Sequence, residues 1–329
     1  MAKAATKTAA KPVTSGRRSS IGGARRKKTL MLLSMVAPGA IWFFILRYVP
    51  LLGIVISFKD YRIYSKNPTF LNNLIHSEWV GLKNFKFMFS STQTMNAVKN
   101  TLVYNALWIV LGLVLSVIFA IILNEITKKF VAKVYQTMMF FPYFLSWVVA
   151  SYFVLAFLDP TKGLITNWQA SMGMEATNWY YNPKPWPIIL TIASMWKNTG
   201  YSTILYLAAI TGIDGTQYEA ASIDGATKFQ QARYVTLPHL KSMIIILFIM
   251  NVGKIFNADF GLFYNVPLNS GALFSTTQVI DTFVYTAFKS TGNMGMSTAA
   301  GFLQNVVGFV CIMLTNTIVR KVDPDSSLF

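Results

Sequence analysis

Long apolar stretches separated by shorter polar ones make up most of this chain after residue 28. A transmembrane helix needs about 20 mostly apolar residues. Six segments meet this length: 29–58, 99–124, 134–158, 186–212, 241–263 and 295–319. The first segment contains Pro38 and Pro50, so we expect it to tilt or to break. The pattern therefore predicts an all-α membrane protein with six transmembrane helices.

The Lys and Arg residues between these segments predict the orientation of the chain in the membrane. Cytoplasmic segments of membrane proteins carry an excess of positive charge. With the N-terminus inside, the two terminal segments and the loops 125–133 and 213–240 would be cytoplasmic. They hold about twice as many Lys and Arg residues as the outer loops 59–98, 159–185 and 264–294. The distribution therefore predicts that both termini are cytoplasmic.

The composition is typical of a membrane protein, and much of the positive charge lies in the first 28 residues. The sequence is 53% hydrophobic and 12% charged, whereas soluble domains carry about 25% charged residues. Residues 1–28 contain several Lys and Arg residues and no acid. We interpret 1–28 as a disordered cytoplasmic tail and 29–329 as one transmembrane domain. No nucleic-acid partner is predicted, and the single cysteine, Cys311, excludes an intrachain disulfide.

The inner loop 213–240 is polar and has the pattern of two short helices. Thr216 and Glu219 have the spacing of a capping box, which would begin the first helix. Gly225 can break that helix, and Thr227 can cap a second one that Pro238 is expected to stop before the chain re-enters the membrane. The pattern predicts a compact helical surface on the cytoplasmic side.

The same loop resembles the EAA motif of ABC-importer permeases. That motif has Glu-Ala-Ala, three residues, Gly, nine residues, Ile, one residue and Leu-Pro. The matching residues here are Glu219, Ala220, Ala221, Gly225, Val235, Leu237 and Pro238. Val235 stands where the family usually has Ile, which keeps a β-branched apolar side chain.

The resemblance extends along most of the chain. Residues 79–85 look like the VGLxNF element of maltose-transporter-type sugar permeases, and the segments 100–102, 140–143 and 223–226 are also similar to that family. Residues 48–50, 279–282 and 327–329 resemble most closely the lipoprotein-B-like and rhamnogalacturonan-type oligosaccharide permeases of Gram-positive bacteria. The resemblance covers about 29–329 and leaves out the basic tail.

The resemblance implies a specific machine in the bacterial cytoplasmic membrane. Its fold is that of a type I ABC importer permease with a cytoplasmic coupling helix. A second, homologous permease would complete the pathway, two cytoplasmic ATPase subunits would dock on the coupling loop, and an extracellular binding lipoprotein would deliver the oligosaccharide. The residues implied in ATPase coupling are Glu219, Ala220, Ala221, Asp224, Gly225, Leu237 and Pro238.

Cofactor motifs are absent from the sequence itself. It contains no G-x-x-x-x-G-K-[ST] phosphate loop, no G-x-G-x-x-G and no H-E-x-x-H. We therefore expect ATP and Mg²⁺ to bind the partner subunits, and we expect a transport subunit rather than an enzyme. His239 has no second His, Cys or carboxylate at ligand spacing, so no metal site is predicted.

Polar residues within the predicted spans are candidates for the substrate pathway, because polar groups at membrane depth normally face a cavity or a partner. The candidates are Trp196, Asn198, Tyr201, Asn251, Lys254, Asn257 and Gln304. Sugars present hydroxyl groups to amides and C–H faces to aromatic rings, so this mixture suits a glycan. The alternative is that the amides join neighbouring helices and the rings mark the lipid interface.

Two other hypotheses remain open on the sequence. One is a polytopic membrane enzyme, such as a glycosyl- or acyltransferase, which would need converging acid, base or metal-binding groups. The other is a membrane anchor or assembly protein without transport of its own. An ATPase and a second permease should co-purify with this chain only if it is an importer subunit.

The orientation can be tested by cysteine labelling in a Cys311-free background. A cysteine introduced at Ser91 should react with an impermeant thiol reagent in intact cells, because Ser91 lies in a predicted outer loop. A cysteine at Gln230 should react only after permeabilisation. Labelling of the Gln230 position in intact cells would reverse the orientation.

Overall fold

The computed structural model describes residues 18–63, 69–89 and 91–329, which are mostly helical. The elements of the first part are α1 (Arg18–Phe43), η1 (Phe44–Tyr48), η2 (Val49–Phe58), β1 (Lys59–Asp60), α2 (Phe70–His76), β2 (Glu78–Trp79), α3 (Lys83–Lys86) and η3 (Phe87–Phe89). The two short strands pair antiparallel, with Lys59 opposite Trp79.

The long helices follow. They and the short elements between them are α4 (Thr92–Asn124), α5 (Lys129–Phe140), η4 (Phe141–Phe144), α6 (Trp147–Leu158), α7 (Leu164–Ser171), α8 (Trp186–Ile210), α9 (Gly215–Ile223), α10 (Lys228–Gln231), η5 (Ala232–Thr236) and α11 (Leu237–Val252). The last elements are α12 (Phe260–Asn265), η6 (Gly271–Leu273), α13 (Phe274–Thr277), α14 (Ile280–Thr291), α15 (Met294–Val322) and η7 (Pro324–Ser326).

The chain divides into two compact units, Met1–Val55 and Ile56–Phe329. In the first unit, the predicted break takes the form of a change from α-helix to the π-helix η1 and then to the 3-10 helix η2, which contains Pro50. Helix α1 begins at Arg18 and so includes residues 18–28 of the predicted tail. Residues 1–17 of the predicted tail lie outside the described residues.

Fewer helices meet the requirements for a membrane span than the six segments predicted. Within the described ranges, four are long and apolar enough: Arg26–Phe58, Thr92–Asn124, Lys228–Val252 and Met294–Val322. A fifth is obtained if Lys129–Phe144 and Trp147–Leu158 form one span with a 102° bend. Helix α8 matches the predicted span 186–212 in length, but polar residues such as Lys197 and Asn198 lower its mean hydropathy.

Two predicted spans differ in shape from the structure. The segment 134–158 is sharply bent after Pro142, and Ser146 begins α6 as an N-cap whose hydroxyl accepts a hydrogen bond from the Val149 N–H. The segment 241–263 is interrupted, because α11 ends at Val252 and the chain unwinds before α12. Apolar length alone could not show either interruption.

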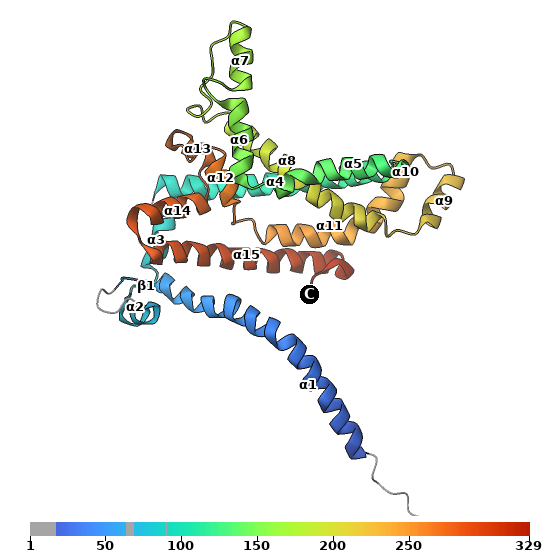
Figure 1. Ribbon diagram of the computed structural model, residues 1–329, viewed down its shortest axis with the longest axis horizontal. Coiled ribbons are helices and arrows are strands. Elements are labelled where there is room, and N and C mark those ends of the chain that lie inside the picture. The colour runs from blue at the N-terminus through green and yellow to red at the C-terminus, as the bar shows by residue number, and fades with distance from the viewer. Residues whose placement is uncertain (1–17, 64–68, 90) are drawn as a thin grey trace, which may run out of the picture. The chain divides into compact units, whose positions relative to one another are not determined.

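Within the second unit, α4, α5, α8, α11 and α15 run alongside one another, with α9 and α10 at one end (Figure 1). Helices α6 and α7 stand across this group. Helix α4 packs along α8 through side chains that include Val117 and Ala120 on α4 and Tyr206 and Ile210 on α8. This contact forms one of the hydrophobic clusters of the chain.

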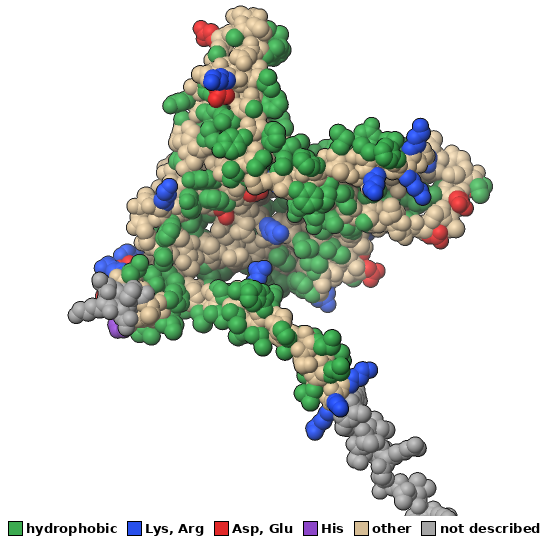
Figure 2. Space-filling model, in the orientation of Figure 1, with side chains coloured by type: hydrophobic (Ala, Val, Ile, Leu, Met, Phe, Trp, Pro, Cys, Tyr) green, Lys and Arg blue, Asp and Glu red, His purple; other side chains and the backbone are tan. Residues whose placement is uncertain are grey.

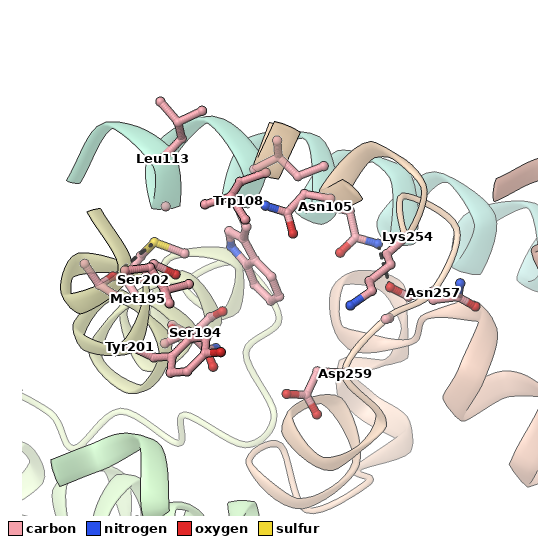
Figure 3. Close-up of a pocket in the computed structure, with 18 of the residues that line it drawn as sticks. Asn105, Trp108, Leu113, Ser194, Met195, Tyr201, Ser202, Lys254, Asn257 and Asp259 are labelled. Atoms are coloured by element: carbon pink, nitrogen blue, oxygen red, sulfur yellow. Dashed lines mark hydrogen bonds between the residues drawn. The ribbon is translucent and has the colours of Figure 1, made fainter. Parts of the chain in front are cut away.

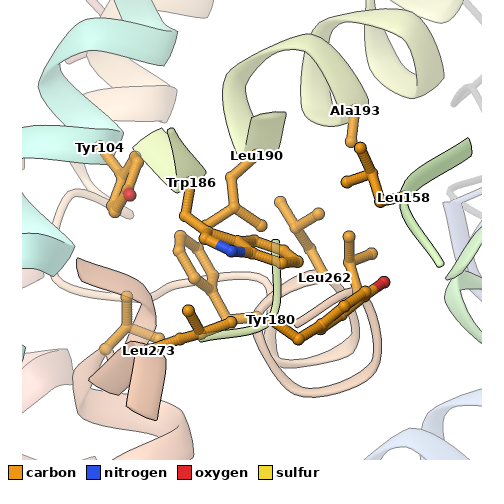
Figure 4. Close-up of a cluster of buried hydrophobic side chains, with 11 residues drawn as sticks. Tyr104, Leu158, Tyr180, Trp186, Leu190, Ala193, Leu262 and Leu273 are labelled. Carbon is orange, nitrogen blue, oxygen red and sulfur yellow. The ribbon is translucent and has the colours of Figure 1, made fainter. Parts of the chain in front are cut away.

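A second cluster surrounds Trp186 at the start of α8 (Figure 4). The Trp186 side chain is fully buried, and its indole Nε1 donates a hydrogen bond to the Trp179 carbonyl at 2.8 Å. Tyr104 from α4 and Leu262 from α12 belong to the same cluster, so it joins helices that are far apart in the sequence. It holds α12 in place beside α4 and α8.

Apolar side chains cover much of the face of the second unit seen in Figure 2. Exposed members on the long helices include Val110 of α4, Phe153 of α6 and Phe309 of α15. Such an apolar surface is expected where helices face lipid or another subunit, since soluble monomers rarely expose large apolar patches.

The segment after α15 folds back and joins α15 to the start of α11. Asp323 pairs with Lys241 at 2.8 Å, and the Ser326 hydroxyl lies 3.0 Å from that of Ser242. The Asn316 side chain accepts a hydrogen bond from the Leu328 N–H at 2.7 Å. The hydrogen bonds from Lys241 and Ser326 hold the pKa of Asp323 below its usual value. The base of α11 is therefore fastened to α15.

Glycines permit a close helix contact near the C-terminal end of α11. A Cβ atom at Gly308 of α15 would collide with the Gly253 carbonyl, and one at Gly253 would collide with the Ile312 side chain. Helices approach this closely only where side chains are very small.

We predict that Gly308→Ala lowers the thermal stability of the purified protein, because α15 must move away from Gly253. Overpacking of this kind costs about 1–3 kcal/mol. Gly301→Ala is the control, since a Cβ there meets nothing within 4 Å and Ala is favoured over Gly in a helix. Thermal unfolding in detergent measures both variants, and equal stability of Gly308→Ala and wild type would contradict the packing.

Candidate functional site

The chain leaves helical geometry between α11 and α12, in residues 253–259, called the unwound segment below. It begins with turns in which the Lys254 N–H donates to the Asn251 carbonyl and the Asn257 N–H to the Lys254 carbonyl. It ends at Asp259, the N-cap of α12, whose carboxylate accepts from the Leu262 N–H at 3.3 Å. Backbone groups outside a helix need other partners at membrane depth.

Three side chains from other helices supply these partners. The Asn105 amide on α4 donates to the carbonyls of Ile255 at 2.8 Å and Asn257 at 3.1 Å. The Gln304 amide on α15 donates to the Phe256 carbonyl at 2.7 Å. The Asp281 carboxylate on α14 accepts from the Ala258 N–H at 2.8 Å and from the Gln304 amide at 3.2 Å. These contacts fix the shape of the unwound segment.

A cavity of about 580 Å³ lies between α4, α8, the end of α11 and the unwound segment (Figure 3). Its lining combines amides, aromatic rings and two charged groups. These side chains are Asn105, Asn198, Asn251, Asn257, Trp108, Tyr201, Lys254 and Asp259. Figure 3 shows Lys254 and Asn257 on one side of the cavity and Tyr201 and Ser194 on another.

Two of the three aromatic side chains that line the cavity, Trp108 and Tyr201, stack on other rings. The Trp108 indole donates to the Thr191 hydroxyl at 3.0 Å and stacks on Phe263, with 5.5 Å between ring centroids. Tyr201 stacks on Tyr143 at 4.6 Å. Rings fixed in this way offer flat apolar faces at little entropic cost on binding.

The structure brings together five of the seven pathway candidates. Asn198, Tyr201, Asn251, Lys254 and Asn257 all line this cavity.

Two candidates lie elsewhere. Trp196 lines a separate apolar pocket between α6 and α8, where it contacts Phe153. It points away from the cavity because it is two residues before Asn198, and residues two apart on a helix point to different sides. Gln304 is buried and holds the Phe256 carbonyl instead of facing the cavity. For Gln304 the helix-joining alternative describes the geometry better.

Sequence reasoning missed Asn105 and Trp108. Both belong to α4, and they are three residues apart, so they share one face of a mostly apolar helix. The three-residue spacing of an amide and an indole on an apolar helix could have identified them as candidates. Asp281 was missed because it lies in a segment predicted to be an outer loop, and its partners come from parts of the chain distant in sequence.

The loop 213–240, for which the EAA resemblance predicts coupling to the ATPase, is called the coupling loop below. It contains the two predicted short helices, α9 and α10, but the first begins differently. Its N-cap is Asp214, whose carboxylate accepts from the Thr216 N–H at 3.0 Å. That hydrogen bond lowers the pKa of Asp214. The predicted capping box of Thr216 and Glu219 is therefore wrong, because α9 starts before Thr216. Glu219 is exposed to solvent.

The turn between α9 and α10 follows the prediction more closely. Gly225 has a φ of 77°, a left-handed conformation that glycine adopts without strain. Asp224 is the C-cap residue of α9 and is exposed. Thr227 caps α10 in a capping box with Gln230. Pro238 does not stop the helix, which runs as one candidate span from Lys228 to Val252.

The geometry around Pro238 explains why the helix continues. Proline lacks an N–H, and the preceding turn widens into the π-helix η5. The His239 ring nitrogen lies 2.7 Å from the Val235 carbonyl. Leu237 and Pro238 thus form the first turn of α11, where proline is tolerated.

Side-chain contacts join the coupling loop to the long helices. The Tyr218 hydroxyl lies 2.9 Å from that of Thr236, and the Gln231 amide donates to the Ser222 hydroxyl at 2.8 Å. Lys228 pairs with Glu125 at the end of α4 at 3.0 Å. The loop is therefore a folded unit rather than a flexible connection.

The outer face of this loop carries exposed apolar side chains. Ile223 is 87% exposed and Phe229 is 75% exposed. Ala220 is exposed as well, and Ala221 beside it is partly exposed. Exposed apolar side chains next to small ones make a surface suited to close contact with another protein.

The comparisons with known proteins assign the chain to a family. The profile of the family described as "Binding-protein-dependent transport system inner membrane component" matches residues 112–325. This range includes α8, the coupling loop, the unwound segment and all of α15. The chain belongs to this family.

Relatives among curated proteins and solved structures agree with the assignment. The polygalacturonan/rhamnogalacturonan transport system permease protein YteP of Bacillus subtilis is 36% identical over 88% of this chain and 88% of its own length. Protein LplB of the same organism is 33% identical over 92% of this chain and 91% of its own length. A chain of a bacterial ABC transporter involved in the import of the acidic polysaccharide alginate superposes with a TM-score of 0.79 at 29% identity, covering 90% of this chain and 97% of that chain.

We predict that Gln304→Leu destabilises the protein and impairs transport together. The substitution leaves the Phe256 carbonyl without its donor and removes one donor to Asp281, which costs about 1–3 kcal/mol. The measurements are thermal unfolding of the purified permease and uptake in cells. Asn305→Ala is the matched control, because that exposed amide bonds only to the Gly301 carbonyl of its own helix. If both variants behave alike, Gln304 does not hold the unwound segment.

Proposed function

We propose that this chain is a permease subunit of an ATP-driven ABC importer that takes up oligosaccharides from polysaccharide breakdown. The observation that carries the proposal is the cavity, in which fixed rings of Trp108 and Tyr201 lie beside four amide side chains. Aromatic faces and amides match the two faces of a sugar ring. The similarity to YteP and to the alginate transporter, both named for polysaccharide substrates, supports this substrate class.

In this proposal the chain crosses the membrane six times, and both termini are cytoplasmic. The bent pair of α5 and α6 makes one span, and α8 makes another. Low hydropathy in α8 is compatible with a span, because Asn198 and Tyr201 would face the pathway instead of lipid. The distribution of Lys and Arg residues supports the orientation.

The cavity is one half of a pathway in this proposal, and a second, homologous permease supplies the other half. An extracellular binding lipoprotein delivers the substrate. One solved relative is the bacterial alginate ABC transporter in complex with an alginate pentasaccharide-bound periplasmic protein, which supports a partner of this kind.

Two ATPase subunits bind ATP and Mg²⁺ and dock on the cytoplasmic side. The docking surface on this chain is the coupling loop, with Glu219, Ala220, Ala221, Asp224 and Gly225 on α9 and its turn. Exposed Ile223 and Phe229 would be covered by the ATPase. Leu237 and Pro238 would pass the motion to α11, since α10, η5 and α11 form one continuous helix.

We predict that Gly225→Val reduces recruitment of the ATPase and uptake of oligosaccharide, while the two permeases still assemble. A branched residue in a left-handed conformation costs about 1–2 kcal/mol, so the turn between α9 and α10 should change shape. The measurements are the ATPase co-purified per permease and oligosaccharide uptake by cells.

The matched control is Gly173→Val, outside the coupling loop. Gly173 has a φ of 72°, and a Cβ atom there meets nothing within 4 Å, as at Gly225. It should bear the same backbone strain without loss of ATPase binding. Normal ATPase recruitment by Gly225→Val would remove the coupling role, and absence of any co-purified ATPase with wild type would favour a membrane enzyme or anchor.

A further inference from the structure

The two charged side chains that line the cavity differ in the partners that they have. Lys254 and Asp259 are the charged residues in its lining. Both oxygens of Asp259 already have partners: one accepts from the Leu262 N–H at 3.3 Å, and the other from the Trp147 indole at 2.5 Å. Asp259 also attracts the nearby Lys197 ammonium. The Asp259 carboxylate is therefore engaged by groups other than Lys254.

Lys197 is occupied in turn. Its ammonium donates to the Tyr143 carbonyl at 2.8 Å and lies 5.4 Å from the ring centres of both Tyr143 and Trp147. It is buried and does not line the cavity. Lys197, Trp147 and Asp259 thus form one polar group beside the cavity. The neighbouring Asp281 carboxylate bonds to the Ala258 N–H and the Gln304 amide. Neither carboxylate is therefore paired with Lys254.

Lys254 is the opposite case. Its ammonium has no hydrogen-bond acceptor, carboxylate or aromatic ring as a partner among the described residues, and the side chain is exposed to the cavity. Figure 3 shows its amino group directed into the space between Trp108 and Asp259. The amides of Asn251 and Asn257 line the cavity beside it, three residues before and after it in the chain. A cation at membrane depth normally has a counter-charge.

We infer that the missing counter-charge is carried by the substrate, and that Lys254 selects oligosaccharides with carboxylate groups, that is, uronic acid residues. This inference rests on the proposed function and adds a substrate class to it. The ammonium would pair with the sugar carboxylate, while Asn251 and Asn257 bond to its hydroxyls and Trp108 contacts its ring. The hydrogen bonds to the backbone of the unwound segment fix the position from which the Lys254 side chain extends before substrate arrives.

The test is uptake by cells that carry the complete importer, with substrates matched except for charge. The acidic probes are the trisaccharides of galacturonate and of mannuronate. The neutral probes are their methyl esters and a galactose trisaccharide. Wild type should take up at least one acidic probe more efficiently than its own ester.

Variants then assign the preference to Lys254. Lys254→Met should reduce uptake of the acidic probe by about tenfold or more, since hydrogen bonds to charged groups are among the strong ones. It should change uptake of neutral probes little. Lys254→Arg should retain much of the acidic uptake, because the charge remains. Lys289→Met, an exposed lysine of α14 outside the cavity lining, is the control and should behave as wild type.

Three other outcomes would contradict either the inference about Lys254 or the proposed function. Equal loss of acidic and neutral uptake in Lys254→Met, with the complex still assembled, would mean that the counter-charge belongs to the second permease, and it would overturn the inference. If the chain is needed for uptake of the neutral probes but not of the acidic ones, the inference about uronic acids is wrong, and the proposed function as an oligosaccharide permease stands. If uptake of no probe depends on the chain, the proposed function itself fails.

Discussion

The arrangement of the second unit depends on how the backbone of residues 253–259 is satisfied. Leaving helical geometry at membrane depth exposes several peptide groups, and each unpaired group would cost several kcal/mol. Asn105, Asp281 and Gln304 meet this requirement from three different helices. Because those helices must be in register for the contacts to form, the same bonds that keep the segment open also fix α4, α14 and α15 around it.

The break in the helix at residues 253–259 brings polar side chains into the cavity lining. In a continuous helix these polar side chains would be distributed around the helix axis, and every peptide group would be hydrogen-bonded within the helix. The unwound segment instead places Lys254, Asn257 and Asp259 at the edge of one cavity. Close packing of Gly253 against Gly308 keeps the end of α11 beside α15. The cavity lining therefore depends on a local loss of regular structure that neighbouring helices stabilise; discontinuous helices of this kind occur in many membrane transporters.

Sequence patterns predicted the helical class, the polar inner loop and five of the cavity residues, because apolar length and isolated polar positions follow from membrane physics. They did not predict the bend after Pro142, the end of α11 at Val252 or the role of Gln304. Those features depend on partners distant in sequence: Asp281 and Asn105 hold backbone groups with which they share no periodic pattern. Glu219 was misjudged for a local reason, since Asp214 offered an earlier cap.

The continuous helix from Lys228 to Val252 has a mechanical consequence. Its 25 residues make a rod ~37 Å long, with the loop 213–240 at one end and the cavity lining at the other. A rotation of roughly 5° about its base would carry the far end ~3 Å, a displacement comparable to the length of a hydrogen bond. A small push on α10 is therefore enough to break or make contacts around Lys254, so this helix can act as a lever without any change in its own structure.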